Sequence, residues 1–140
     1  MIQHILLATD GSAPAERAAD FAASLATRYA ARLTVLYAFD PVPHYLGEPN
    51  YSQALHQTLK EANSLVDDVA KRLHEIGATG VTTEVIGGPA ADAILSVVGT
   101  RKPDLLVMGA RGLGTWQGVI LGSVSMAVIQ RAECPVLVVK

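Results

Sequence analysis

A glycine-rich segment between residues 109 and 125 carries the groups best suited to binding an anion. It opens as Gly109-Ala110-Arg111-Gly112 and closes, after nine further residues, as Gly122-Ser123-Val124-Ser125. Glycine lets the main chain approach a phosphate closely, and a helix starting at Ser123 would present unpaired N–H groups and a partial positive charge. Arg111 adds the one cation of the segment, and the hydroxyls of Ser123 and Ser125 add donors. We therefore expect phosphate binding, chiefly through main-chain donors.

A simpler explanation of this segment is that its glycines only mark turns and that Ser123 only caps a helix. Phosphate binding is favoured because several glycines and two serines follow one buried strand. Better-known phosphate motifs do not match. The segment lacks Gly-Lys-Ser/Thr, which excludes a P-loop, and its glycines miss the dinucleotide-binding spacing by one residue.

Composition narrows the class of protein further. The chain has 140 residues, a formal net charge of −2, and scattered lysines and arginines in place of a basic stripe, which argues against a nucleic-acid backbone as partner. It carries neither a signal-peptide pattern nor an apolar run of about 20 residues, so we expect no membrane span. The single cysteine, Cys134, excludes an intramolecular disulfide. We expect one domain, residues 1–140, in the cytoplasm.

Strand and helix patterns alternate along the chain. Apolar runs predict strands at residues 5–8, 33–39, 81–86, 105–108 and 136–139. Helical spacing predicts helices at residues 15–29, 55–76, 90–98 (broken near Gly99) and 123–131, with residues 41–50 as a loop. The apolar stripe of the longest helix also suits a coiled coil, but packing on a sheet is favoured. Alternation of this kind predicts an α/β fold with an open parallel sheet and helices on both faces.

Ligands of such a sheet bind outside the carboxyl ends of the strands. The loops that meet there are Thr9–Ser12, Phe39–Asp40, Ile86–Gly88 and the segment 109–125. Asp10 stands at this edge as a candidate ligand, and either Asp10 or Ser12 can cap the following helix.

The sequence resembles the universal stress proteins. The pattern Gly-x2-Gly-x9-Gly-Ser, formed by Gly109, Gly112, Gly122 and Ser123, is similar to the ATP-binding signature of that family, and residues 5–12 and 134–139 resemble its opening and closing strands. The resemblance covers nearly the whole chain. It implies a Rossmann-like sheet of five parallel strands in the order 3-2-1-4-5, related to the adenine nucleotide α-hydrolase folds.

The resemblance also implies a ligand, ATP with Mg²⁺, and a role for each matching residue. Asp10 would lie near the ribose or make an indirect contact with the metal, and Ala38 would contact adenine through its main chain. The glycine segment would surround the phosphates, with Arg111 and Ser125 in support. The expected site is Ala8, Thr9, Asp10, Ala38, Gly109, Arg111, Gly112, Gly122, Ser123, Val124 and Ser125.

Several functions fit this set of residues. A nucleotide-dependent regulatory protein of the stress response is favoured, with at most slow hydrolysis, because the segment shows no lysine and no second carboxylate. A genuine ATPase and a protein that acts through dimerisation without nucleotide remain alternatives. A nucleotidyl-transfer enzyme is the least favoured, since its Ser-Gly-Gly-x-Asp-Ser or His-Ile-Gly-His motifs are absent.

Residues outside the glycine segment suggest a partner but little further chemistry. Val136–Val139 would form an apolar edge strand, which favours a homodimer over a monomer with a covered edge. The histidines show no metal-ligand spacing, and Cys134 is better explained as a small buried residue than as a nucleophile. His44 and Tyr45 could touch a ligand, although a solvated loop is favoured for them.

Overall fold

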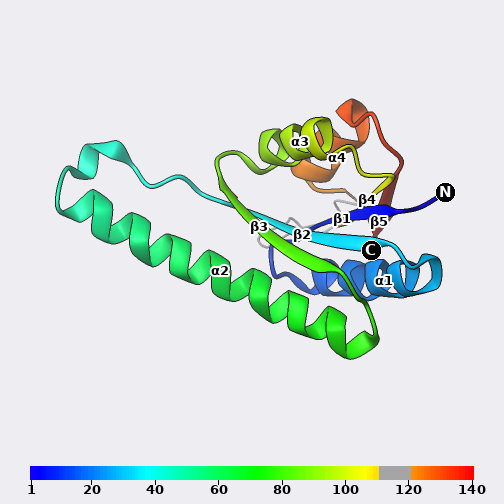
Figure 1. Cartoon of the computed structure of the whole chain (residues 1–140). Coiled ribbons are helices and arrows are strands. Elements are labelled where there is room, and N and C mark those ends of the chain that lie inside the picture. Colours follow the sequence, from blue (N-terminus) through cyan, green and yellow to red (C-terminus); the bar gives the residue numbers. More distant parts are fainter. Residues whose placement is uncertain (111–120) are drawn as a thin grey trace.

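The computed structural model describes residues 1–110 and 121–140. Five strands and four α-helices alternate in it, with one short 3-10 turn after the second strand (Figure 1). Their bounds are β1 His4–Ala8, α1 Ala13–Tyr29, β2 Arg32–Phe39, η1 His44–Leu46, α2 Asn50–Ile76, β3 Val81–Gly87, α3 Ala90–Arg101, β4 Leu105–Gly109, α4 Ser123–Arg131 and β5 Val136–Val139.

The strands form one sheet in the order β3-β2-β1-β4-β5, and every neighbouring pair is parallel. Helices α1 and α2 cover one face, and α3 and α4 cover the other (Figure 1). The expected fold class and strand order are therefore confirmed.

Each face of the sheet has its own apolar core. Ile5, Leu33 and Val107 point toward α1 and α2, whereas Leu6 and Leu106 point toward α3 and α4. Helix α1 buries only alanines, at positions 15, 18, 19, 22, 23 and 26. Because alanine ends at Cβ, this helix lies close against the strands, and the loop that precedes it is held near their carboxyl ends.

Two helices differ from the sequence-based expectation. Helix α3 continues through Gly99 to Arg101, so the predicted break is wrong. A glycine inside a helix costs about 1 kcal/mol relative to alanine, which the buried contacts of Ile94, Val97 and Val98 offset. Helix α2 begins at Asn50, earlier than its apolar stripe.

The long helix α2 packs on the sheet and on α1, as favoured over a coiled coil. Its buried residues, Ala62, Val66 and Leu73, lie from the middle of the helix onward. The first turns of α2 therefore extend past the sheet (Figure 1). Within the described residues, no helix is both long and apolar enough to cross a bilayer.

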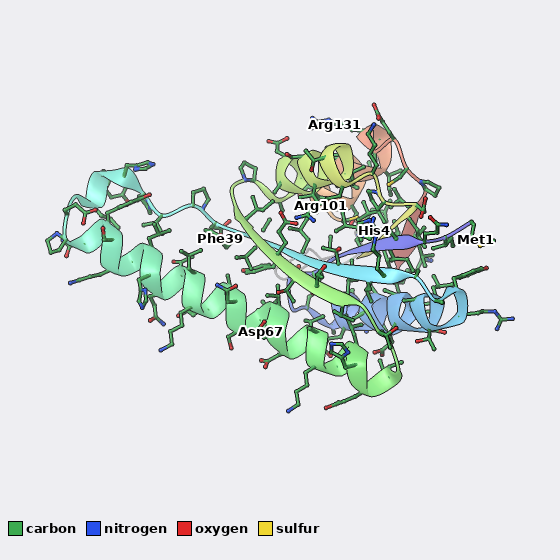
Figure 2. All side chains as sticks on the ribbon, viewed as in Figure 1. Met1, His4, Phe39, Asp67, Arg101 and Arg131 are labelled. Carbon is green, nitrogen blue, oxygen red and sulfur yellow. The ribbon has the colours of Figure 1, made fainter. Side chains whose placement is uncertain are left out.

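A buried polar cluster lies near the start of β1. His4 is only 5% exposed, and its Nε2 lies 2.9 Å from Thr34 Oγ1, while its Nδ1 has no hydrogen-bond partner among the described residues. Figure 2 shows His4 on β1 within the body of the molecule. Burial lowers the pKa of His4, Arg32 and Arg101 lower it further, and Asp104 opposes them. His4 is therefore neutral in the folded protein near pH 7.

We expect this histidine to make the fold sensitive to acid. Because the folded-state pKa lies below the unfolded value of 6.5, the unfolded state takes up the proton first. Stability is then complete above about pH 6.5 and falls as the pH drops toward the folded-state pKa, by about 1.4 kcal/mol per unit of pKa difference. The free energy of unfolding in urea, measured at pH 7.5 and 5.5, should fall less between these pH values for His4→Gln than for wild type. The exposed His56→Gln is the control, and an equal loss in all three proteins would contradict the expectation.

Candidate functional site

A crevice opens at the carboxyl ends of β1, β2 and β4, on the face covered by α3 and α4. It has a volume of about 210 Å³. Its lining residues are Ala8, Thr9, Asp10, Ala15, Leu36, Ala38, Ala90, Ile94, Met108, Gly109, Gly122, Ser123, Val124 and Ser125. The crevice lies where the strand order reverses, which is the usual ligand position in an open parallel sheet.

The floor of the crevice is apolar. Ala8, Leu36 and Met108 come from three adjacent strands and belong to the core under α3 and α4, and Ile94 of α3 belongs to the same core. Side chains two residues apart on a strand share a face, so Ala38 lies on the same side as Leu36. The floor suits a flat, weakly polar group.

The main chain of Ala38 faces the crevice without a partner from β1, although Ala38 pairs in register with Ile86 of β3 on its other side. In a parallel sheet, a residue directs its N–H and its C=O toward the same neighbouring strand. Every second residue along the strand faces that same neighbouring strand, and the residues between them face the strand on the other side. Bonds from Arg32 N to Gln3 O (3.0 Å) and from Thr9 N to Leu36 O (2.9 Å) show that even-numbered residues of β2 face β1. The β1–β2 ladder ends at Ala8 and Leu36. Among the described residues, no main-chain hydrogen bond is made to Ala38 beyond it.

The loop after β1 shapes the side of the crevice that carries the carboxylate. Asp10 Oδ1 accepts a hydrogen bond from Ser12 N (2.9 Å), and Ser12 Oγ accepts one from Ala15 N (3.3 Å). Ser12 is therefore the cap of α1, and Asp10 orders the loop. Asp10 is the one ionisable side chain among the described residues that line the crevice.

The opposite side is the start of α4. Its N-cap is Gly122, and none of the described side chains caps the helix. Ser123 therefore stands inside the first turn, and the capping explanation for it is wrong. The first-turn amides of Ser123, Val124 and Ser125 carry the partial positive charge of the helix terminus. Gly122 has φ −73° and ψ 165°, a conformation open to any residue.

Two residues of the glycine segment have structural roles that the sequence did not reveal. Ser125 is buried, and its hydroxyl donates to Gly109 O (2.9 Å) and Ala110 O (3.1 Å), so its hydrogen is directed at the end of β4. A Cβ on Gly109 would lie 3.0 Å from Ala15 N and from Pro14 C. The glycine lets β4 approach the start of α1.

The structure places the described members of the predicted set in one crevice, whereas Arg111 and Gly112 lie outside the described residues. Sequence reasoning missed Ala15, Leu36, Ala90, Ile94 and Met108. Leu36 could have been found from its two-residue spacing to Ala38, and Ala90 and Ile94 from their four-residue spacing on α3. Of the loops considered, Phe39–Asp40 and Ile86–Gly88 do not line the crevice. A Cβ on Gly87 would lie 2.9 Å from the Phe39 ring.

The remaining candidates lie away from the crevice. His44 stacks on Tyr51 with ring centroids 4.9 Å apart, and Tyr45 is exposed. Cys134 is half-buried, and burial raises its thiol pKa. Over the described ranges, no three His, Cys, Asp or Glu side chains gather as a metal site would require.

Three comparisons with known proteins all find the same family. The model of the universal stress protein family matches residues 1–140. A universal stress protein of Thermus aquaticus is 43% identical over 143 residues, with 100% of each chain covered. The solved UspA of Lactobacillus plantarum is 27% identical with a TM-score of 0.88, over 99% of this chain and 98% of that one. A universal stress protein crystallised in complex with cAMP is 28% identical, with a TM-score of 0.79 over 99% and 97%.

The close approach at Gly109 predicts a stability effect that is independent of any ligand. Gly109→Ala places a Cβ against main-chain atoms of α1, which cannot move as a flexible side chain can, and should destabilise by about 1–3 kcal/mol. Gly99→Ala is the matched control, because a Cβ there meets nothing within 4 Å and should stabilise α3 by up to about 1 kcal/mol. Chemical unfolding of both variants checks this. A Gly109→Ala protein as stable as wild type would refute the packing role.

Proposed function

The chain belongs to the universal stress protein family, and we propose that it is a regulatory member that binds an adenine nucleotide, with ATP as its natural ligand, in the crevice. The observation that carries this proposal is that two sets of main-chain groups, neither with a partner among the described residues, face each other across one apolar floor. One is the donor and acceptor of Ala38, and the other is the uncapped first turn of α4. The cAMP complex of a 28% identical family member supports the choice of adenine.

Adenine fits the Ala38 groups better than guanine does. The Watson–Crick edge of adenine offers an amino donor and a ring acceptor, which match a C=O and an N–H of one residue. Guanine offers an acceptor and a donor in the reverse positions. A site whose polar groups are left unpaired by the wrong ligand discriminates strongly. The phosphates would then reach the amides of Ser123–Ser125, where helix charge favours an anion.

Magnesium fits this arrangement as an ion bound to the phosphates of the nucleotide. Mg²⁺ keeps several waters and commonly binds through one or two carboxylates plus phosphate oxygens. Asp10 supplies one carboxylate at the edge of the crevice. Asp10 would hold or orient the ion, whose contribution is to neutralise phosphate charge.

Binding outweighs catalysis in this proposal. Hydrolysis requires an oriented water and stabilisation of charge on the γ-phosphate. The described residues that line the crevice supply one carboxylate and no cationic side chain, and Arg111 is the sequence-based candidate for the second role. We therefore expect turnover to be slow, and the protein to act in the cytoplasm through a surface that changes with the bound nucleotide.

Self-association through β5 completes the proposed function. Two hydrogen bonds join β4 to this edge strand: Leu106 N donates to Pro135 O, and Ala110 N donates to Val139 O. The main-chain groups of odd-numbered residues of β5 therefore face β4. The N–H and C=O of Val136 and Val138 therefore face outward. A two-fold axis through this edge would pair these groups with a second copy.

Exposed apolar side chains on both sides of β5 support this pairing. On α1, Phe21 lies one turn after Arg17, whose Nε bonds to Lys140 O, and Phe21 is 55% exposed. On α4, Arg131 faces Asp92 of α3, so Ile129, two residues earlier, lies on the side turned away from α3. Ile129 is 43% exposed. Self-association would remove both from water.

Calorimetric titration tests nucleotide binding. Nucleotide-free protein should bind MgATP with micromolar affinity and GTP at least about 10-fold more weakly, because guanine leaves Ala38 unpaired. Gly122→Val should abolish binding by placing a branched side chain before the α4 amides. Its backbone angles suit valine, and a cooperative thermal unfolding transition is the control that shows the variant to be folded. Absent binding by folded wild-type protein would favour the alternative of a family member that acts without nucleotide.

Release of ADP from MgATP separates regulator from ATPase. If the protein is a regulator, we expect far less than about one turnover per minute, and Arg111→Ala should alter binding and hydrolysis alike. A steady rate of several per second that Arg111→Ala removes without weakening binding would establish the ATPase alternative.

The β5 edge predicts a specific pattern of assembly variants. Val138→Pro should keep the ladder with β4, since the N–H of Val138 faces outward, but should block pairing with a second copy. Val138→Thr keeps both the N–H and the branched shape and is the matched control. Analytical ultracentrifugation should find a dimer for wild type and Val138→Thr and a monomer for Val138→Pro. A dimer in all three would place the interface elsewhere.

A further inference from the structure

Strand β3 forms the second edge of the sheet, on the side opposite β5. None of its residues is buried, whereas all five residues of β1 are. In Figure 1, β3 lies in front of the other strands, and neither a helix nor a loop crosses it. Over the described residues, the outer edge of β3 is therefore accessible to another strand.

The main-chain groups that β3 directs outward belong to its odd-numbered residues. Leu33 N donates to Gly80 O (3.2 Å), and Gly88 N donates to Phe39 O (3.0 Å). Even-numbered residues of this segment therefore face β2, and the residues between them face the opposite side. The outward-facing residues are Val81, Thr83 and Val85. Beyond the ladder with β2, no main-chain hydrogen bond from the described residues reaches them.

Strand β3 lacks the features that commonly protect an edge strand from pairing. Residues 81–87 contain neither proline nor lysine, and their register with β2 runs one to one, without a bulge. The one charged side chain of the strand, Glu84, lies 3.1 Å from Nη2 of Arg101, which balances its charge. An incoming strand would therefore meet neither a kink nor an unpaired charge.

The sequence of β3 identifies a second copy of this chain as the strand that fits its edge. A two-fold axis at Thr83 would place two β3 strands antiparallel, with Thr83 opposite its own counterpart and Val81 opposite Val85. β-Branched residues would then face each other at these outward positions, and such pairs stabilise a sheet. This register also sets Glu84 opposite Thr82. An axis at Glu84 would instead set two carboxylates directly opposite each other, which is unfavourable.

We propose that a second interface between copies of this chain forms by antiparallel pairing of two β3 edges about Thr83. This interface goes beyond the proposed function and does not depend on it. The exposed apolar side chains that flank β5, Phe21 and Ile129, have no counterpart on β3. The β3 edges therefore pair more weakly than β5 and at higher protein concentration. Because β3 and β5 are opposite edges, a dimer formed through β5 retains two β3 edges and can join further dimers.

Hydrogen exchange of the β3 amides in wild-type protein tests this pairing residue by residue. At a protein concentration of about 50 μM, the odd-numbered amides should exchange fast and the even-numbered ones slowly, because only the latter are bonded to β2. At about 1 mM, the odd-numbered amides should exchange at least about twofold more slowly, in proportion to the fraction of unpaired edges. The even-numbered amides Thr82, Glu84 and Ile86 are the internal control and should change less.

Substitutions of Thr83 separate pairing from folding. Thr83→Pro removes an outward N–H but leaves the ladder with β2 intact. Because both copies lose the same bond, the dissociation constant of β3 pairing, from sedimentation equilibrium up to about 1 mM protein, should rise at least about tenfold. Thr83→Val keeps the N–H and the branched shape and should leave this constant within about twofold of wild type.

A charged variant covers the case in which Thr83→Pro does not fold. Thr83→Lys keeps the N–H of an exposed residue, but it places two like charges opposite each other at the axis. It should also weaken the pairing, and added salt should restore part of the affinity. A cooperative thermal unfolding transition shows that each variant is folded.

Several results would overturn this proposal. Odd-numbered amides that stay unprotected up to about 1 mM protein would exclude a second copy and leave the edge to a strand of another protein. Odd-numbered amides protected at both concentrations, with an assembly size that Thr83→Lys leaves unchanged, would show that the edge is covered within one copy. Association that neither Thr83→Pro nor Thr83→Lys weakens would place the contact on another surface.

Failure of the proposed function gives a different result. A wild-type protein that does not pair through β5, or that binds no nucleotide, can still show concentration-dependent protection of Val81, Thr83 and Val85. That outcome would remove the proposed function and retain the β3 interface. A protein that dimerises through β5 and binds MgATP, but whose β3 amides are insensitive to concentration and to Thr83→Lys, would retain the proposed function and refute the β3 interface alone.

Discussion

The candidate site depends on one feature of the sheet, which is that β1 stops while β2 continues. The register pairs Ala8 with Leu36, and β2 then runs on to Phe39 with no bond to its inner edge from the part of the chain that the structure describes. Beyond that point a ligand can take the position that the next residues of β1 would have occupied, and can hydrogen-bond to Ala38 as a strand would. The turn at Thr9–Ser12 supports this geometry, because Ser12 caps α1 and Asp10 orders the loop.

The other half of the site follows from how α4 is attached. The N-cap position is held by a glycine, so the terminal amides of the helix face the crevice without an acceptor among the described side chains. The buried hydroxyl of Ser125 fixes the angle at which they do so, through the carbonyls of Gly109 and Ala110. The N–H of the same residue, Ala110, donates to Val139 O at the end of β5. The candidate site and the exposed edge of the sheet are thereby parts of one hydrogen-bonded structure.

Much of this architecture could be predicted from the sequence, since strand and helix patterns alternate clearly and the glycine segment follows a buried strand. The resemblance to a family was needed for the strand order and for Ala38, because the free edge of Ala38 arises from register, which no local pattern encodes. The continuous helix through Gly99 was missed because glycine weakens a helix locally while burial of its neighbours stabilises it. The roles of Ser125 and Gly109 depend on contacts between distant segments, so their residue types alone suggested ligand binding.

The central claim is that a nucleotide spans the crevice from the Ala38 main chain to the α4 amides. The most direct test is an NMR titration of ¹⁵N-labelled protein with AMP, which follows each amide separately. A nucleotide bound in this way should cause large shift changes for Ala38 and for Ser123–Ser125 in the same concentration range, with the surface amides of α2 unchanged. Saturable binding that leaves Ala38 and the first turn of α4 unperturbed would contradict it.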